Sequence, residues 1–265
     1  MPKYRYEELT WPEVREAVAD KKVVLIPVGT IEQHGPHLPL AVDVITSTAV
    51  CERAAAAVPD LALTMPPISY AFNEHHMDFP GTIAVDAHHF IDYVTDVGKS
   101  VARHGFRKIV LVNGHGSNVP FLDICARLIT NSTDAICAMA PWWGVVPKEV
   151  WERVRESEFP GGVAHACEIE TSMLLYLRPD LVDMSKAVKE IAFQKSKFFW
   201  WDLMGSSGIQ FQEWFSRYTS TGIVGDPTLA TAEKGKAVVE AAVAGIVELV
   251  RDIHQREIAP RVDHH

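Results

Sequence analysis

Acidic and histidine side chains are spaced like metal ligands in the segment Gly29–Asp43 (G-T-I-E-Q-H-G-P-H-L-P-L-A-V-D). Glu32 and His34 are two residues apart, so in an extended segment both side chains leave the backbone on the same side. A carboxylate and an imidazole directed at one point are suitable ligands for zinc, manganese or iron. The glycine and prolines that follow predict a turn that returns Asp43 to the same point, where its carboxylate could bridge two cations.

A second candidate ligand, His115, lies in the loop Asn113–Asn118 (N-G-H-G-S-N). This loop follows Arg107–Val112, which reads as a buried strand, just as the first loop follows the apolar run Lys22–Val28. In an α/β sheet, the loops after the strands form the ligand-binding edge. A histidine in a turn is more often a plain surface residue, but two strand ends that both supply ligand-type residues favour a shared site.

Two further polar clusters are weaker candidates. His165 precedes Glu168 and Glu170 in a segment (A-H-A-C-E-I-E-T-S) where a helix is predicted to begin near residue 167. Acidic residues in a first helical turn also stabilise the helix dipole, so this pattern alone does not establish a site. The segment Asn73–Thr82 contains His76 and reads by default as a surface loop.

Strands and helices are predicted to alternate along the chain. Besides the two strands named above, apolar runs predict strands at Leu61–Met65 and Ala135–Ala140. Helices are predicted at Ser47–Val58, from Asp86 to near Gly105, at Val119–Ile129, at Cys167–Tyr176 and at Thr228–His254, the last with Asp226 as its N-cap. This alternation predicts an α/β fold in a single domain spanning residues 1–265, with a mostly parallel sheet flanked by helices on both faces.

Composition restricts the class of protein. The 265 residues are 48% hydrophobic and 22% charged, which is ordinary for a globular protein. The net charge of −9 disfavours nucleic acid as a partner, because phosphate binding needs a basic face. No stretch has the roughly 18 apolar residues of a membrane helix, so no membrane partner is expected. Four scattered cysteines and an N-terminus without a signal-peptide pattern are typical of a cytoplasmic protein.

Together these motifs resemble the creatininase (creatinine amidohydrolase) family. The stretch E-Q-H-G-P-H-L-P-L from Glu32, with Asp43, is similar to the family's N-terminal metal motif, and N-G-H-G around His115 is similar to its central motif. The stretches 76–82, 165–172 and 222–227 also match, so the resemblance spans nearly the whole chain. It implies two divalent cations per subunit, zinc, manganese or iron. The family pattern assigns Glu32, Asp43 and His115 to one metal and His34 and Asp43 to the second, with Asp43 bridging.

One position departs from the family pattern. Creatininase has a glutamate two residues after the histidine of the central motif, where it would ligate the second metal, whereas this chain has Ser117. The family assignment does not depend on this position, but the choice of creatinine as the substrate does. Glu170 is a candidate replacement for the missing ligand, or a residue that orients His165.

The resemblance implies metal-assisted hydrolysis of a small-molecule substrate. Two cations would lower the pKa of a bound water towards neutrality and polarise the substrate carbonyl. His165 would then protonate the leaving group as a general acid, a role suited to a histidine pKa near 6.5. His76, Ser117 and Trp142 are candidates for lining the substrate site.

An aromatic segment, Phe193–Tyr218, interrupts the alternation of strands and helices. Such a segment packs into a core, covers a site as a lid, or contacts another subunit. Because the family resemblance implies a homo-hexamer, we expect this segment to contribute to a subunit interface or to cover a neighbour's active site.

Three functions are consistent with these residues. The first is hydrolysis of a C–N bond in a cyclic amide, a formamide or a similar small polar compound. The second is hydrolysis of a C–C bond in a cyclic diketone derived from inositol or sugar, by the same metal chemistry. The third is phosphate or nucleotide binding by the loop Gly114–Asn118 at a helix start. It is disfavoured because the chain lacks a P-loop lysine and the spacing of a dinucleotide fingerprint.

Overall fold

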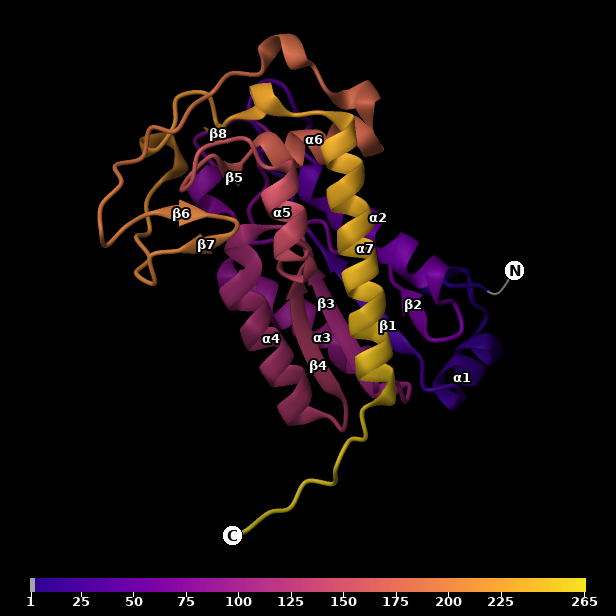
Figure 1. Ribbon diagram of the computed structural model, residues 1–265. Helices are drawn as coiled ribbons and strands as arrows, with labels where there is room; N and C mark the ends of the chain where they lie inside the picture. The colour runs from indigo at the N-terminus through magenta and orange to yellow at the C-terminus, as the bar shows by residue number, and fades with distance from the viewer. Residues whose placement is uncertain (1–2) are drawn as a thin grey trace.

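Four parallel strands form the central sheet of the computed structural model, which describes residues 3–265 (Figure 1). Their order in the sheet is β2-β1-β3-β4, and every neighbouring pair is parallel. All residues of β1 and β3 are buried, as expected for strands covered on both faces. The strands are β1 (Val23–Val28), β2 (Ala62–Thr64), β3 (Lys108–Asn113) and β4 (Ile136–Pro141).

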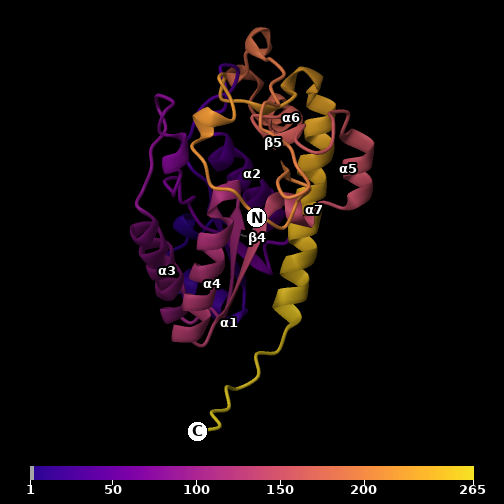
Figure 2. The ribbon, with the colours of Figure 1, turned by 90° about the vertical axis from the view of Figure 1, so that its left-hand side faces the viewer.

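Helices cover both faces of this sheet, and Figure 2 shows the sheet between α3 and α4 on one side and α7 on the other. One core lies between the sheet and α1 (Trp11–Ala19), α3 (Ala87–Arg103) and α4 (Val119–Ser132). The other lies between the sheet and α2 (Val42–Ala57), α5 (Lys148–Val154), α6 (Glu168–Leu177) and α7 (Ala232–Gln255). The predicted single-domain α/β fold, with helices on both faces of a parallel sheet, is confirmed.

Helix α3 begins and ends close to the residues that the sequence signals predict. The Asp86 side chain accepts hydrogen bonds from the backbone N–H groups of His88 and His89, which have no partner within the helix. Phe90 and Val94 lie on the apolar stripe of the helix, and both are buried in the core. Gly105 follows the last turn with a positive φ of 108°, a conformation that glycine adopts at little cost.

Two predicted helix starts are wrong. Helix α2 begins at Val42 instead of Ser47, so Asp43 lies in its first turn and is not carried by a loop. Helix α7 begins at Ala232, where the Thr231 side chain caps it by accepting from the N–H of Lys234. Asp226 instead caps a short 3-10 helix, Pro227–Leu229. The cap signal at Asp226 thus marks a real helix start, but the long helix begins only at Ala232. Helices α1 and α5 were not predicted.

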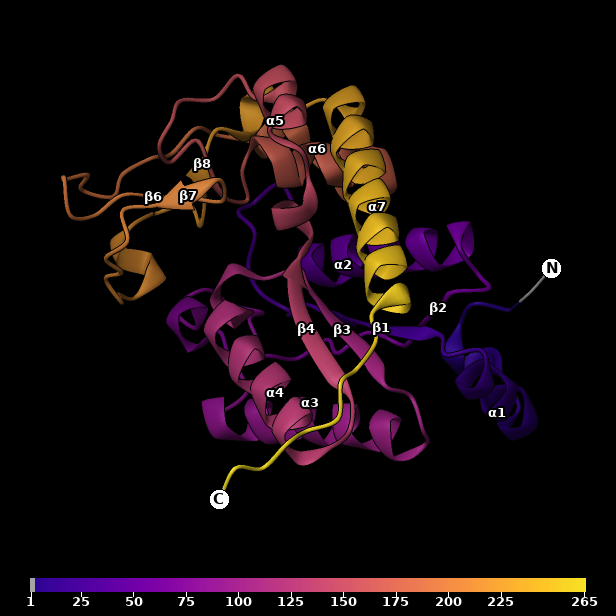
Figure 3. The same ribbon diagram turned by 60° about the horizontal axis from the view of Figure 1, so that its bottom comes forward.

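The aromatic segment forms an extension on the side of the molecule opposite α1 (Figures 1 and 3). It contains the hairpin β6 (Trp201–Asp202) and β7 (Gly205–Ser206). The buried Asp202 carboxylate fastens the hairpin, because it accepts hydrogen bonds from Arg155 at 2.9 and 2.7 Å and from the N–H of Gly161 at 2.8 Å. Nearby, β5 (Val163–His165) pairs antiparallel with β8 (Val224–Gly225). Among the described residues no helix is long and apolar enough to cross a membrane.

Candidate functional site

Two glycines allow the loops after β1 and β3 to pack directly against the start of α2. A Cβ atom on Gly29 would lie 2.6 Å from the backbone nitrogen of Val44, and one on Gly114 would lie 2.4 Å from the backbone oxygen of Asp43. Any larger residue would push these loops away from the helix. The close approach carries Asp43 to the carboxyl ends of the two strands, between the loop of Glu32 and the loop of His115.

The six residues predicted from sequence as metal ligands or catalytic groups lie together in this place. Asp43 is at the centre: its Oδ1 is 3.3 Å from Nε2 of His34, and its Oδ2 is 3.2 Å from Nδ1 of His115. His115 Nδ1 is also 3.2 Å from Oε1 of Glu32. Glu32, Asp43 and His115 therefore form one compact group of possible metal ligands, and His34, Asp43 and Glu170 form a second group that shares Asp43.

Glu170 and Ser117 occupy different parts of the site. The Glu170 carboxylate lies 4.0 Å from Nε2 of His34, so the second group has three potential ligands without any contribution from residue 117. Ser117 instead makes a 2.9 Å hydrogen bond with Nε2 of His75 on the cavity wall. The position at which the family pattern has a glutamate is thus part of a neutral polar pair in this chain.

Glu168, the other acidic residue at the start of α6, has a structural role. Its carboxylate is fully buried and accepts hydrogen bonds from the N–H groups of Glu156 and Ser157. It also pairs with Lys234 of α7 at 2.5 Å. Glu168 and Glu170 are two residues apart in this first helical turn, so their side chains leave on opposite sides of α6. Glu170 therefore faces the metal-ligand cluster, and Glu168 faces the interface between α6 and α7.

The clustered atoms fit divalent cations. Several of them are buried and have no hydrogen-bond partner: both carboxylate oxygens of Glu32, Nε2 of His34 and Oδ2 of Asp43. Burying carboxylates without counter-charge is costly, so positive charge is needed among them. The oxygen and imidazole donors are the ligand types that zinc, manganese and iron accept.

Protonation of the two histidines shows the same need for positive charge. Burial alone would lower the pKa of His34 and His115, but the carboxylates of Asp43 and Glu32 outweigh it and raise these pKa values to about 9 and about 10. Burial raises the pKa of Glu170 to about 7. Protons on the imidazoles thus supply the charge that a bound cation would bring to the same nitrogen atoms.

The hydrogen bond on the far side of His34 sets its orientation as a ligand. Its Nδ1 lies 3.2 Å from the backbone carbonyl of Glu32, which can only accept, so Nδ1 carries a proton. In the neutral ring Nε2 then keeps its lone pair towards Asp43 and Glu170, as in many metal-binding histidines. On the neighbouring loop, Asn113 fixes the backbone around His115 by accepting from its N–H at 3.0 Å and donating to its carbonyl at 2.7 Å.

His165 lies beside the cluster, and a hydrogen bond to the backbone fixes the ring nitrogen that faces away from the cluster. Its Nε2 donates to the backbone carbonyl of Gln33 at 2.8 Å, which leaves Nδ1 facing Oε1 of Glu32 at 3.6 Å. Burial, and then the charge on protonated His34, lower the pKa of His165 well below its usual value. The ring is therefore neutral, with an unprotonated nitrogen directed at the cluster. His34, Glu32 and His165 are also close enough together to hold a cation.

Gln33 and Phe215 are two contributors that sequence reasoning missed. The Gln33 side chain lies 3.1 Å from Nδ1 of His76 and 3.1 Å from Nε2 of His165, and its oxygen accepts from the N–H of Gly35. Phe215 is buried and stacks on His76 with ring centroids 4.0 Å apart. Alternation places Gln33 opposite Glu32 and His34, a signal that could have been used. No local signal marks Phe215, which arrives from far along the chain.

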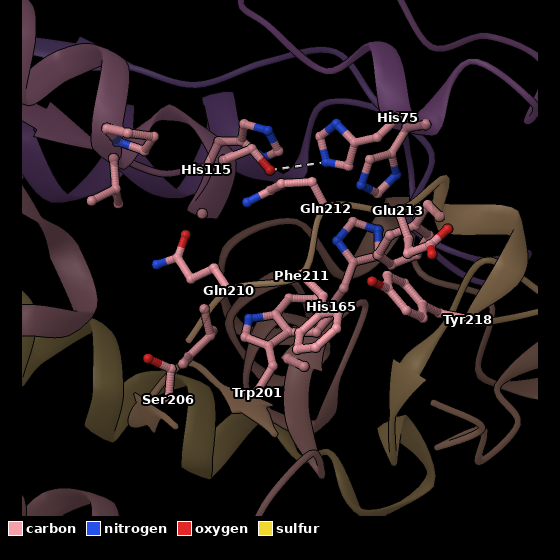
Figure 4. Close-up of a pocket in the computed structure, with 18 of the residues that line it drawn as sticks. His75, His115, His165, Trp201, Ser206, Gln210, Phe211, Gln212, Glu213 and Tyr218 are labelled. Carbon is pink, nitrogen blue, oxygen red and sulfur yellow. Dashed lines mark hydrogen bonds between the residues drawn. The ribbon is translucent and has the colours of Figure 1, made fainter. Parts of the chain in front are cut away.

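A cavity of about 920 Å³ opens above the cluster and is walled by the aromatic segment. Figure 4 shows His75, His115 and His165 on its wall, with Gln210 and Gln212 reaching towards the space between them. His76 and Ser117, predicted to line the substrate site, do line this cavity. Trp142 does not, so its assignment is corrected: it is 1% exposed in the core, and the next residue, Trp143, lines the cavity instead. Both tryptophans belong to a 3-10 helix, Trp142–Val145, in which side chains of successive residues leave in different directions around the axis.

The cavity also bears on two of the sequence expectations. The aromatic segment covers the cavity of its own chain, in addition to any contact with another subunit. The phosphate-binding interpretation of the loop Gly114–Asn118 gains no support, because His115 of this loop faces the carboxylates of Glu32 and Asp43 at 3.2 Å and so belongs to the group of possible metal ligands.

Comparison with known proteins agrees with this geometry. The family model described as "Creatininase: Creatinine amidohydrolase" matches residues 7–250. The chain belongs to the creatininase family. The family consists of metal-dependent hydrolases, and the present chain is a creatininase-family hydrolase.

Three characterised creatininase-family relatives carry different names. The creatinine amidohydrolase of Pseudomonas putida is 32% identical, over 92% of this chain and 95% of its own length. The 3-dehydro-scyllo-inosose hydrolase of Thermotoga maritima is 29% identical, over 95% of this chain and 84% of its own. The mycofactocin precursor peptide peptidase of Mycolicibacterium smegmatis is 32% identical, over 86% of this chain and 84% of its own.

Solved creatininase structures share the fold over the full length. A crystal structure of creatinine amidohydrolase superposes with a TM-score of 0.84 at 29% identity, covering 97% of this chain and all of the other. A manganese form and a zinc–zinc form of creatininase give TM-scores of 0.82 and 0.83 at 30% and 29% identity, covering 96% and 97% of this chain and 100% of each of theirs. Creatininase structures thus carry zinc or manganese, and this chain buries carboxylates and histidines that could hold such ions.

Proposed function

We propose that this protein hydrolyses the C–N bond of an amide or formamide, using two divalent cations bound to each chain. The observation that carries this proposal is the position of Asp43, whose two carboxylate oxygens face two different histidines within two adjoining groups of ligand atoms. A carboxylate between two such groups is the arrangement that a pair of metal ions a few ångströms apart requires.

The ligands divide between the two ions. Glu32, Asp43 and His115 would hold one, and His34, Asp43 and Glu170 would hold the other. Bound there, the ions would supply Lewis-acid polarisation of the substrate carbonyl and would make a water acidic enough to attack near neutral pH. Glu170 is assigned here as a ligand of the second ion, because it shares that group with His34 and Asp43.

His165 would move the proton of the reaction. Its Nδ1 faces the cluster without a proton, so it is poised to accept one from the attacking water and then to donate it to the leaving nitrogen. In the balanced reaction, the water oxygen forms a bond to the carbonyl carbon, the C–N bond breaks, and the nitrogen leaves with the proton. The general acid assigned from sequence therefore also acts as the general base of the first step.

Gln33 and His76 would keep His165 in this orientation. The backbone carbonyl of Gln33 fixes the proton on Nε2 of His165, and its side-chain nitrogen donates to Nδ1 of His76, whose ring packs beside that of His165 with centroids 4.8 Å apart. Phe215 closes the other side of both rings, with centroids 4.0 Å from His76 and 4.8 Å from His165, and so excludes water from them. A neutral, dry imidazole is the form that proton transfer needs.

The names of the relatives support an amide as the substrate and keep one alternative in view. An amidohydrolase and a peptidase both break C–N bonds, and both are 32% identical to this chain. The inosose hydrolase, at 29% identity, favours the second candidate, hydrolysis of a C–C bond in a cyclic diketone from inositol or sugar. The same cluster could serve either reaction, since the two differ in the leaving group.

The test is to incubate metal-loaded protein with cyclic amides, formamides and inososes and to identify the products. Release of ammonia, an amine or formate supports C–N hydrolysis. Ring opening of an inosose without loss of nitrogen would replace it with C–C hydrolysis. If metal analysis of the purified protein shows no stoichiometric divalent ion and zinc or manganese cannot be added, both proposals fail.

A further inference from the structure

The cavity above the metal-ligand cluster is much larger than a single small ring requires. Its volume of about 920 Å³ is near the upper end of the roughly 300–1,000 Å³ that protein pockets offer to ligands of drug size. The cluster occupies only its floor, and the remaining wall comes largely from the aromatic segment. A small cyclic amide bound at the floor would leave this outer part without an occupant.

Two side-chain amides stand in the outer part. Gln210 and Gln212 line the cavity and are exposed, and Figure 4 shows both reaching towards the space in front of His115 and His75. They take no part in any hydrogen bond recorded among the described residues of the chain. Each amide offers both a donor and an acceptor, so each can pair with the C=O and the N–H of a peptide group.

The charge of the outer lining disfavours a polyanionic group there. Arg217 is the single lysine or arginine that lines the described cavity, and Glu213 already neutralises it in an ion pair. Glu74 adds a negative charge to the lining. A phosphorylated or strongly acidic group in the outer part would find no free lysine or arginine and would be repelled by Glu74.

Aromatic rings supply the rest of the outer wall. Trp143, Trp201 and Phe211 line the cavity beside the two glutamines. Flat rings of this kind bury an apolar or aromatic side chain and stack against it in offset or edge-to-face geometry. A wall that presents both amides and aromatic rings suits a chain that carries both peptide groups and apolar side chains.

We infer that the outer cavity binds the arm of a linear, uncharged, peptide-like amide, with an apolar or aromatic side chain against the aromatic wall and its peptide groups on Gln210 and Gln212. This inference rests on the proposed amide hydrolysis and names its substrate class. It replaces the expected small cyclic substrate with an extended one, whose scissile amide lies at the cluster while the arm lies outside it.

The experiment uses metal-loaded protein and blocked phenylalanine peptides of one to four residues, with a five-membered cyclic amide for comparison. Amine release gives kcat/KM. We expect kcat/KM to rise at least about tenfold from the cyclic amide to the longer peptides, the effect of one or two neutral hydrogen bonds plus ring burial. The double variant Gln210→Ala, Gln212→Ala should reduce this length-dependent gain about tenfold. Gln194→Ala is the matched control, since it removes an exposed glutamine of the same segment that does not line the cavity.

A binding measurement separates this inference from the proposed function. Peptides built from D-amino acids serve as probes that resist cleavage, and the tryptophans lining the cavity report their binding by fluorescence. Saturable binding that the double variant weakens, without cleavage of any amide, would support the inference and overturn the proposed reaction. Cleavage of the cyclic amide at a rate that longer peptides do not exceed, with no fluorescence titration, would overturn the inference and leave the reaction standing.

Discussion

The Nε2 atom of His165 lies 2.8 Å from the backbone carbonyl oxygen of Gln33, residue 33 being the one between Glu32 and His34. A carbonyl oxygen can only accept, so this contact fixes which ring nitrogen of His165 carries the proton. The segment that supplies two of the proposed metal ligands therefore also sets the tautomer of the proposed proton carrier. Ligand geometry and proton transfer are coupled through one short stretch of backbone.

Replacing His165 with alanine tests whether this histidine carries a proton or binds a metal. We expect His165→Ala to keep both metals, because neither proposed ligand group requires it. kcat should fall about 10²–10⁴-fold, the usual contribution of a general acid–base group, while KM changes much less. Substrates whose leaving group needs little protonation should lose less. Metal loss in this variant would make His165 a ligand, and a near-normal kcat would reduce it to a structural histidine.

The side chain of Gln33 should matter through His76. Its nitrogen donates to Nδ1 of His76 at 3.1 Å, and Gln33→Leu removes this hydrogen bond but keeps a side chain of similar size. We expect about a tenfold loss in kcat with metal content unchanged, because the loss of this hydrogen bond leaves the neighbouring rings of His76 and His165 less well fixed. Nitrogen NMR should show a mixture of tautomers for His76 in the variant, whereas His165 should keep the single tautomer that the backbone carbonyl of Gln33 fixes. An unchanged tautomer of His76 together with a normal kcat would contradict this role.

Two glutamates of helix α6 provide a matched pair of variants. Glu170→Gln should lose about one of two metals per chain, because Glu170 belongs to the group with His34 and Asp43. Glu168→Gln should keep both metals and lower stability by about 1–3 kcal/mol, since it weakens a buried carboxylate that pairs with Lys234. Metal content and urea unfolding check both. Equal metal loss in the two variants would show that α6 acts by general destabilisation.

Glu190 should make the fold sensitive to acid. Burial would raise the pKa of its carboxyl, but hydrogen bonds from the N–H groups and hydroxyls of Thr219, Ser220 and Thr221 outweigh burial and lower it to about 2. Because the folded-state pKa is below the usual value near 4.5, Glu190 contributes stability above that value, and the contribution is lost as pH falls towards 2.

The comparison of metal-free wild type with Glu190→Gln isolates this contribution from other carboxylates. Above pH 5 the variant should unfold at a lower urea concentration than wild type, and the difference should shrink as pH falls from about 4.5 towards 2. A difference in urea midpoint that does not depend on pH would mean that the charge of Glu190 contributes nothing.

The outer face of the aromatic segment predicts self-association. Phe198 is 53% exposed and Met204 is 36% exposed, and neither lines the cavity, so they form an apolar surface that a monomer rarely leaves bare. We expect a homo-hexamer by light scattering, and Phe198→Asp should shift it to smaller species. Tyr93→Asp, at an equally exposed aromatic on α3, is the control and should not. A wild-type monomer at micromolar concentration with full activity would rule out the subunit contact.

Sequence patterns predicted the layers and most of the polar floor of the cavity. Lys22–Val28 and Arg107–Val112 are apolar runs, and the ends of parallel strands must share one edge, so the meeting of Glu32 with His115 followed from topology. Asp43 was placed correctly near them for a wrong reason, because it arrives on the first turn of α2 and not on a turn of the loop.

The walls of the cavity were beyond sequence reasoning. Trp142 and Trp143 are neighbours of the same type, and only the exit direction of β4 decides which one faces the cavity. Phe215 reaches His76 across the fold, and the buried pair of Arg155 and Asp202 that fastens its segment has no local pattern. Contacts between residues distant in sequence depend on tertiary packing, which periodicity does not encode.

The most direct test of the two-cation site is a crystal structure of the metal-loaded protein with anomalous scattering recorded at the absorption edge of the metal. Two peaks should flank Asp43, each about 2.0–2.5 Å from one of its oxygens, one between Glu32 and His115 and the other between His34 and Glu170. The same crystals of Asp43→Ala should show neither peak. A single peak in the wild type, or two peaks that persist without the Asp43 carboxylate, would contradict the bridging role on which the proposed function depends.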